Sequence, residues 1–201
     1  MESNKTSGQN INQIMKDELL LNNELAKLKR VGDINNLIER FYDDLVVSSA
    51  NENHVKELAE LWANLATVQQ IIAPERFNFA PHGKDWQSFV RNKISKRNNL
   101  LLVVHKKDDM EIRGFLYLQT VTIPSSDLIL KGIIEDIYTK PQYRKQEVAF
   151  KLLDTATHWA QSQNIKQIDL IALNKTKDLF EFYSKILKRI EKNINLELLI
   201  V

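Results

Sequence analysis

Three strand-like stretches joined by two short hairpin signals constrain the fold of this 201-residue chain more than any other feature. Residues 99–106 and 111–123 are separated by Lys-Asp-Asp-Met, and 128–139 follows after Pro-Ser-Ser-Asp. Turns at such short spacing predict antiparallel pairing of neighbouring strands. A helical pattern over about 147–163 and an apolar strand over 166–173 come next. A strand–helix–strand unit of this kind predicts a parallel crossover.

The remaining elements complete a sheet that is covered on both faces. They are a strand over 44–49, helices over about 53–66, 84–96 and 177–188, a loop over 67–83, and a closing strand over 195–201. The order of elements predicts an α/β fold with an α+β mixed sheet. We expect this sheet to be mostly antiparallel, with a βαβ crossover and helices on both faces.

The N-terminal part of the chain forms a separate unit in this prediction. Apolar residues recur at helical spacing in two stretches of 11–42, and Gly32 separates the two stretches. We predict a helical hairpin extension over 1–42 and a single domain over 43–201. Because a long apolar stripe is not stable in water, we expect 11–42 to pack on the domain, on a second copy in a homodimer, or on a protein partner.

Composition excludes several classes of function. The net charge is only +2 and no apolar run approaches the length of a membrane span, so we expect neither nucleic acid nor a membrane as partner. There is no cysteine, which excludes disulfides, thiolate zinc sites and a cysteine nucleophile. The four histidines are scattered without metal-ligand spacing, so we expect no metal site. We expect a cytoplasmic protein.

Residues 137–153, IYTKPQYRKQEVAFKLL, place a proline turn between the end of a strand and the start of a helix. The first N–H groups of a helix have no partners within it, so such a start is a natural anion site. The turn contains Arg144, Lys145, Gln146 and Glu147, and no glycine. Two interpretations stay open: a phosphate-binding turn without its glycines, or only a basic turn.

From about residue 44 onward, the chain resembles the GNAT superfamily of acyl-CoA-dependent N-acyltransferases. The strongest part of the resemblance is GIIEDIYTKPQYRKQEVAFKLLDTATHWAQSQNIKQIDL, and NKTKDLFEFYSKI resembles the second cofactor motif of the family. Family members open the helix with a turn of the form Arg/Gln-x-x-Gly-x-Gly/Ala, which aligns with residues 144–149. Glu147 stands at the first glycine position, and Ala149 fits the second.

The resemblance implies acetyl-CoA as the acyl donor and no metal. Its pyrophosphate would bind the backbone N–H groups of Arg144, Lys145, Gln146, Glu147, Val148 and Ala149. Its pantetheine arm would pair with a strand edge near Ile137 and Thr139, where two strands splay apart. Asn174 would belong to the second cofactor motif. Glu147 would weaken the phosphate site, unless its side chain turns outward at an early helix position that dipole and capping favour.

The resemblance also implies that Tyr183 protonates the leaving thiolate. A tyrosine suits this role because its pKa of about 10 lies above the value of about 8.5 for a thiol, so it stays protonated at neutral pH. The alternative is that Tyr183 only packs its helix on the sheet.

Glu135 is the candidate general base, acting directly or through water. The alternative is a surface carboxylate. Strand alternation places Glu135 on one face with Ile133 and Ile137, and places Asp136 on the other face.

Two functions follow from the resemblance. The first is an N-acetyltransferase that transfers an acetyl group from acetyl-CoA to an amine of a small molecule or a protein. The second is a catalytically weak or inactive GNAT-fold protein that acts as a partner-binding or regulatory module through its N-terminal helices.

Overall fold

The computed structural model describes residues 44–77, 85–96, 98–124, 129–144, 147–172, 177–190 and 194–200. The chain divides into two compact units, Met1–Asp44 and Leu45–Val201, and every described helix and strand belongs to the second. The helical hairpin predicted over 1–42 lies outside the described residues, so it stays a prediction.

The described elements follow the predicted order of strands and helices. They are β1 (Leu45–Ser49), α3 (Val55–Ile72), α4 (Trp86–Ser95), β2 (Asn99–Lys106), β3 (Asp109–Ile123), β4 (Ile129–Thr139), α5 (Val148–Ser162), β5 (Gln167–Ala172), α6 (Lys177–Arg189) and β6 (Asn195–Ile200). Short 3-10 helices at Glu52–His54 and Pro141–Tyr143 precede α3 and follow β4. None of the described helices is long and apolar enough to cross a membrane.

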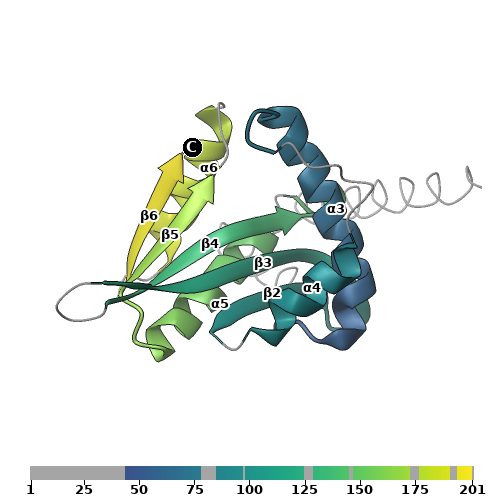
Figure 1. Ribbon diagram of the computed structural model, residues 1–201, viewed down its shortest axis with the longest axis horizontal. Coiled ribbons are helices and arrows are strands. Elements are labelled where there is room, and N and C mark those ends of the chain that lie inside the picture. The colour runs from purple at the N-terminus through teal and green to yellow at the C-terminus, as the bar shows by residue number, and fades with distance from the viewer. Residues whose placement is uncertain are drawn as a thin grey trace, which may run out of the picture. The chain divides into compact units, whose positions relative to one another are not determined.

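The described strands form one mixed sheet in the spatial order β1-β2-β3-β4-β5-β6. The pairs β1–β2, β2–β3 and β3–β4 are antiparallel, and β4–β5 and β5–β6 are parallel. The two hairpins and the parallel crossover through α5 are therefore confirmed. Figure 1 shows the long strands β3 and β4 at the centre, with β5 and β6 extending the sheet on one side.

Two predicted boundaries were wrong. The helix predicted to end near Ala66 continues to Ile72, because no helix-breaking residue occurs before Pro74. The first six residues of the predicted 67–83 loop are therefore helical. Strand β3 begins at Asp109, because Lys106 pairs with Asp109 and leaves a turn of only two residues.

Each face of the sheet has its own hydrophobic core. The α3-side core contains Leu58, Leu61, Trp62, Val90, Leu101, Val103, Phe115, Tyr117 and Tyr138. The α5-side core contains Leu102, Val104, Leu116, Leu118, Ile134, Val148, Leu152, Leu153, Tyr183 and Ile186. Helices therefore cover both faces, as predicted, and Figure 1 shows α5 on the opposite face from α4.

Gly114 of β3 allows the end of β4 and the start of α5 to approach closely. It pairs with Thr139, the last residue of β4. A Cβ atom at position 114 would lie 2.6 Å from the Tyr138 carbonyl oxygen and 2.8 Å from Cγ1 of Val148. Both distances are too short for nonbonded atoms, so only glycine fits here. The absence of a side chain at this position therefore sets how closely the first turn of α5 approaches β4.

We predict that Gly114→Ala destabilises the domain by about 1–3 kcal/mol, the usual cost of overpacking a close contact. Thermal denaturation should show this as a lowered melting temperature. Gly132→Ala is the matched control, because its added Cβ would meet only side-chain atoms of Ile168 and Leu118, at 3.2 Å or more. Equal melting temperatures for the two variants would contradict the close approach at Gly114.

Candidate active site

A bulge in β4 shapes the centre of the candidate site. Tyr117 of β3 pairs with Asp136, but its neighbour Leu118 pairs with Ile134, so Glu135 is an extra residue in the ladder. Pairing with β5 ends at the same place, since the last pair joins Ile134 to Leu170. From Glu135 to Thr139, the edge of β4 that faces β5 has no partner among the described strands, and the two ribbons diverge in Figure 1. The splayed strands implied by the resemblance are present.

The bulge overturns the predicted alternation of side chains along β4. Ile134 and Ile137 both pack with the α5-side core, whereas Asp136 contacts side chains of α3. Glu135 contacts α4, so its carboxylate lies on the same face as that of Asp136. The prediction that Glu135 shares a face with Ile137 was wrong, because an extra residue in a strand reverses the alternation beyond it.

The carboxyl group of Asp136 is hydrogen-bonded to two side chains of α3. Its Oδ2 accepts a hydrogen bond from Nε1 of Trp62 (3.0 Å), and its Oδ1 accepts one from Nε2 of Gln69 (3.3 Å). Burial raises the pKa of the Asp136 carboxyl above its ordinary value, although both hydrogen bonds oppose the shift. A carboxyl with a raised pKa is a stronger base once ionised, so this side chain is suited to proton transfer.

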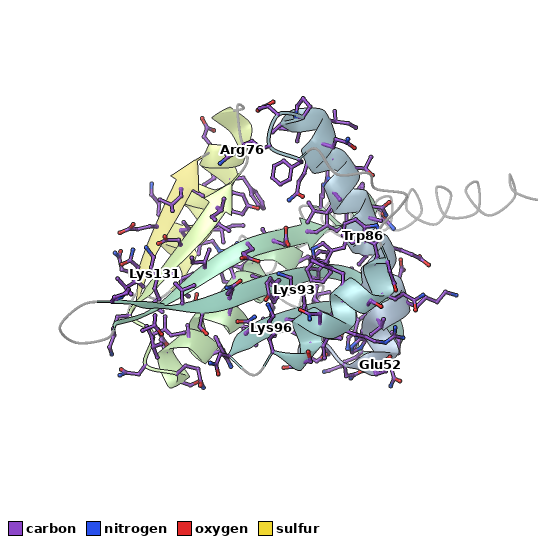
Figure 2. The ribbon with its side chains drawn as sticks, viewed as in Figure 1. Glu52, Arg76, Trp86, Lys93, Lys96 and Lys131 are labelled. Atoms are coloured by element: carbon purple, nitrogen blue, oxygen red, sulfur yellow. The ribbon has the colours of Figure 1, made fainter. Side chains whose placement is uncertain are left out.

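Glu135 is the more exposed of the two carboxylates and is paired. Its Oε2 lies 3.1 Å from Nζ of Lys93, and the side chain of Lys93 is only 13% exposed. The Lys93 ammonium also lies over the ring of Tyr117, 4.0 Å from its centroid. Figure 2 shows Lys93 and Trp86 on α4, in front of the sheet. The two carboxylates of the bulge thus have different surroundings: Asp136 is half-buried and hydrogen-bonded, and Glu135 is in an ion pair.

Stability should depend on pH through Asp136. A raised pKa means that the folded protein holds this proton more tightly than the unfolded chain does. Between about pH 4 and the folded pKa, the free energy of unfolding therefore falls as pH rises. We predict that Asp136→Asn, which keeps an acceptor for Trp62, removes this part of the slope. A tenfold difference in proton affinity between the folded and unfolded chains corresponds to about 1.4 kcal/mol.

Urea denaturation at several pH values measures this dependence, with Glu135→Gln as the control. The control keeps the buried Asp136 carboxyl and should keep its contribution to the slope. A slope in Asp136→Asn identical to that of the parent would contradict the assignment.

The turn after β4 is anchored by an ionic network. Nζ of Lys140 lies 2.8 Å from Oε1 of Glu57 and 2.7 Å from Oε1 of Glu111. The hydroxyl of Tyr143 donates to Oε2 of Glu111. Burial lowers the pKa of Lys140, but its hydrogen bonds to Glu111 and Glu57 outweigh this and leave the pKa above its ordinary value. The turn that leads to Arg144, which is exposed, is therefore fixed to α3 and β3.

The start of α5 differs from the predicted helix start. Glu147 is the residue before the first helical residue and has φ 58° and ψ 1°, in the left-handed region. Such a conformation costs a non-glycine residue about 1–3 kcal/mol, whereas glycine adopts it freely. The predicted stabilisation of Glu147 by capping was wrong, because its side chain accepts no capping hydrogen bond. The N–H groups of Val148, Ala149 and Phe150 precede the first helical bond, from Lys151 N–H to Glu147 O.

The Glu147 carboxylate is turned toward α6. Its Oε1 and Oε2 lie 2.9 Å and 2.8 Å from Nη1 and Nη2 of Arg189, a two-point ion pair. Arg189 also lies over the ring of Phe150, with Cζ 4.1 Å from the centroid. The carboxylate is therefore paired with a cation of α6, and the outward orientation expected of Glu147 stays a prediction.

Tyr183 lies in the α5-side core and is 9% exposed. Burial raises the pKa of its hydroxyl to about 12, so the proton stays on the oxygen at neutral pH. Its ring meets that of Phe182 edge-on at 5.3 Å, while Phe182 is 38% exposed. This position fits the packing role of Tyr183, and its role as a proton donor stays a prediction.

The structure brings together some of the predicted residues. Ile137, Thr139, Val148 and Ala149 lie at the end of β4 and the start of α5, where Gly114 allows close approach. Lys145, Gln146 and Asn174 lie outside the described residues. The sequence interpretation missed Arg189 and the hydrogen bonds of Asp136, because nothing in the local pattern links residues so far apart. No group of three or more histidines, aspartates or glutamates in the described part of the chain could hold a metal ion.

Comparison with protein-family models gives a match over residues 65–187 to the acetyltransferase (GNAT) family. This match covers more than half of the chain. No curated protein sequence matches the chain.

Solved structures with the same fold carry varied names. A transcriptional regulator from Bacillus halodurans C-125 is 17% identical, with a TM-score of 0.57 over 71% of this chain and 91% of that chain. An aminoglycoside acetyltransferase from an uncultured soil metagenomic sample is 16% identical (TM-score 0.55; 76% and 93% covered). A ribosomal-protein-alanine N-acetyltransferase from Brucella melitensis biovar Abortus 2308 is 18% identical (TM-score 0.52; 71% and 89% covered). Identities this low support the fold alone.

Proposed function

We propose, because this chain belongs to the acetyltransferase (GNAT) family, that it is an N-acetyltransferase that transfers an acetyl group from acetyl-CoA to an amine. The observation that carries the proposal is the arrangement at the end of β4. There the edge of β4 over 135–139, which has no partner among the described strands, lies beside the uncapped start of α5. Such an edge can pair with the peptide-like pantetheine arm, and such a helix start can bind a pyrophosphate.

A thermal-shift titration with acetyl-CoA tests the proposal. A ligand at 100 times its dissociation constant stabilises the native state by about 2.7 kcal/mol. For a domain of this size, the melting temperature should then rise by roughly 5–11 °C. Acetyl-pantetheine is the matched control, because it keeps the thioester and lacks the pyrophosphate, so we expect a much smaller shift. If millimolar acetyl-CoA produces no saturable shift, the turn is only a basic turn, and the partner-binding module replaces the enzyme.

The proposed reaction needs two proton transfers. The amine nitrogen attacks the thioester carbonyl carbon, and the carbon–sulfur bond then breaks. The nitrogen loses a proton to a base, and the leaving thiolate gains one from an acid. We propose Tyr183 as the acid, because burial keeps its hydroxyl protonated. We propose Glu135 as the base, acting directly or through water. Asp136 is the alternative base, because the pKa of its carboxyl is raised, whereas the Glu135 carboxylate is paired with Lys93.

We predict that Tyr183→Phe lowers kcat about 10²–10⁴-fold while the affinity for acetyl-CoA changes little. The ring still packs in the α5-side core, and only the proton donor is lost, so the loss belongs to the transition state. Steady-state kinetics with a competent amine, combined with calorimetric binding of acetyl-CoA, separate the two quantities. Phe182→Leu is the control, because it changes the neighbouring ring and removes no proton donor. Unchanged turnover in Tyr183→Phe would leave Tyr183 as a packing residue.

We propose the acceptor only by its chemical class, an amine. Neighbours named for aminoglycoside and for ribosomal-protein-alanine acetylation leave both a small amine and a protein amine open as acceptor.

The region 11–42 is our proposed docking segment for the domain, a second copy or a protein partner. We also propose the cytoplasm as the location, in keeping with a chain that has no cysteine.

A further inference from the structure

The Glu147–Arg189 ion pair lies at the position where the proposed acetyl-CoA site departs most from a glycine-rich loop. Glu147 stands directly before α5 and has a left-handed backbone. Both of its carboxylate oxygens are within 2.9 Å of the Arg189 guanidinium. The two side chains come from opposite ends of their helices: Glu147 precedes the first residue of α5, and Arg189 is the last residue of α6.

Phe150 helps to define where the cation lies. It follows Glu147 by three residues, and both side chains contact the same guanidinium. The guanidinium stacks on the Phe150 ring and pairs with Glu147 at the same time. The cation is therefore beside the first helical turn, where it can act on an anion bound to the N–H groups of Val148 and Ala149.

Charge at this helix start decides how well it binds an anion. The N-terminus of a helix carries a partial positive charge, which attracts a pyrophosphate. A carboxylate at the same place repels that pyrophosphate, and a neighbouring cation cancels the repulsion. The pair is partly exposed, with the Arg189 side chain at 52% and that of Glu147 at 24%. An exposed ion pair adds little to folding, so its main effect should be on the local electrostatic potential.

We propose that Arg189 is a positioning residue for the CoA-binding loop: it holds the Glu147 carboxylate to one side and cancels its charge, so that a loop without glycine still accepts a pyrophosphate. This inference rests on the proposed function. In this proposal, a residue of α6 affects the affinity for acetyl-CoA, and the backbone N–H groups at the start of α5 bind the pyrophosphate.

Calorimetric titration of CoA into the full chain and its variants tests the proposal at low salt. Glu147→Gln removes the negative charge from the helix start and should tighten CoA about two- to fivefold, whereas Arg189→Gln leaves the Glu147 carboxylate without this cation and should weaken CoA by a similar factor. The double variant should return within about twofold of the parent. Arg189→Lys keeps the charge and should restore most of the affinity lost in Arg189→Gln. These differences should shrink in high salt because the charges are screened.

If the two single variants change the affinity for CoA in opposite directions, the ion pair acts by compensating charge and does not only hold the loop in shape. If Glu147→Gln and Arg189→Gln both weaken CoA, the pair only holds the loop in shape, and the proposal is wrong. Equal dissociation constants for the parent and both variants would also overturn it. Melting temperatures measured on the same samples show that each variant is folded, and Arg189→Met, which also removes the charge, carries the comparison if Arg189→Gln is not. A parent that binds no CoA at millimolar concentration would instead overturn the proposed function, and this inference with it.

Discussion

The parting of β4 from β5 after Ile134 is the constraint on which the rest of the candidate site depends. One extra residue, Glu135, interrupts the pairing of β4 with β3 at the point where the ladder to β5 ends. The bulge brings two neighbouring carboxylates to the α3-covered face and turns Ile137 toward the α5-side core. It also leaves the last five residues of β4 with one edge unpaired by any described strand.

The start of α5 shows two opposing effects in one residue. Glu147 has a backbone conformation that glycine would adopt without cost, and it brings a negative charge to an anion site. The pair with Arg189 offsets the charge and holds the side chain toward α6. Gly114 contributes from the other side, because it allows α5 and β4 to approach closely. The left-handed backbone that glycine would adopt is therefore present at Glu147, although the turn contains no glycine.

The sequence predicted the fold well because hydrophobic spacing and turn residues report directly on strands and helices. Strand β2 was predicted to the residue, and the antiparallel pairing of both hairpins and the parallel crossover were predicted correctly. The face of Glu135 was predicted wrongly, because a bulge has no strong signal in residue type and reverses alternation beyond it. The left-handed conformation of Glu147 was equally hidden, since a glutamate normally predicts a regular helix start. The partner of Glu147, forty-two positions away, follows only from the packing of α6 beside α5.

Backbone NMR of the full chain during a titration with CoA shows whether the start of α5 binds the pyrophosphate. We expect saturable changes in amide chemical shift that are largest at Val148, Ala149 and Phe150, the uncapped N–H groups at the start of α5. Smaller changes should follow along the free edge of β4, at Ile137 and Thr139. Saturable changes confined to other parts of the chain, or no change at millimolar CoA, would contradict the account.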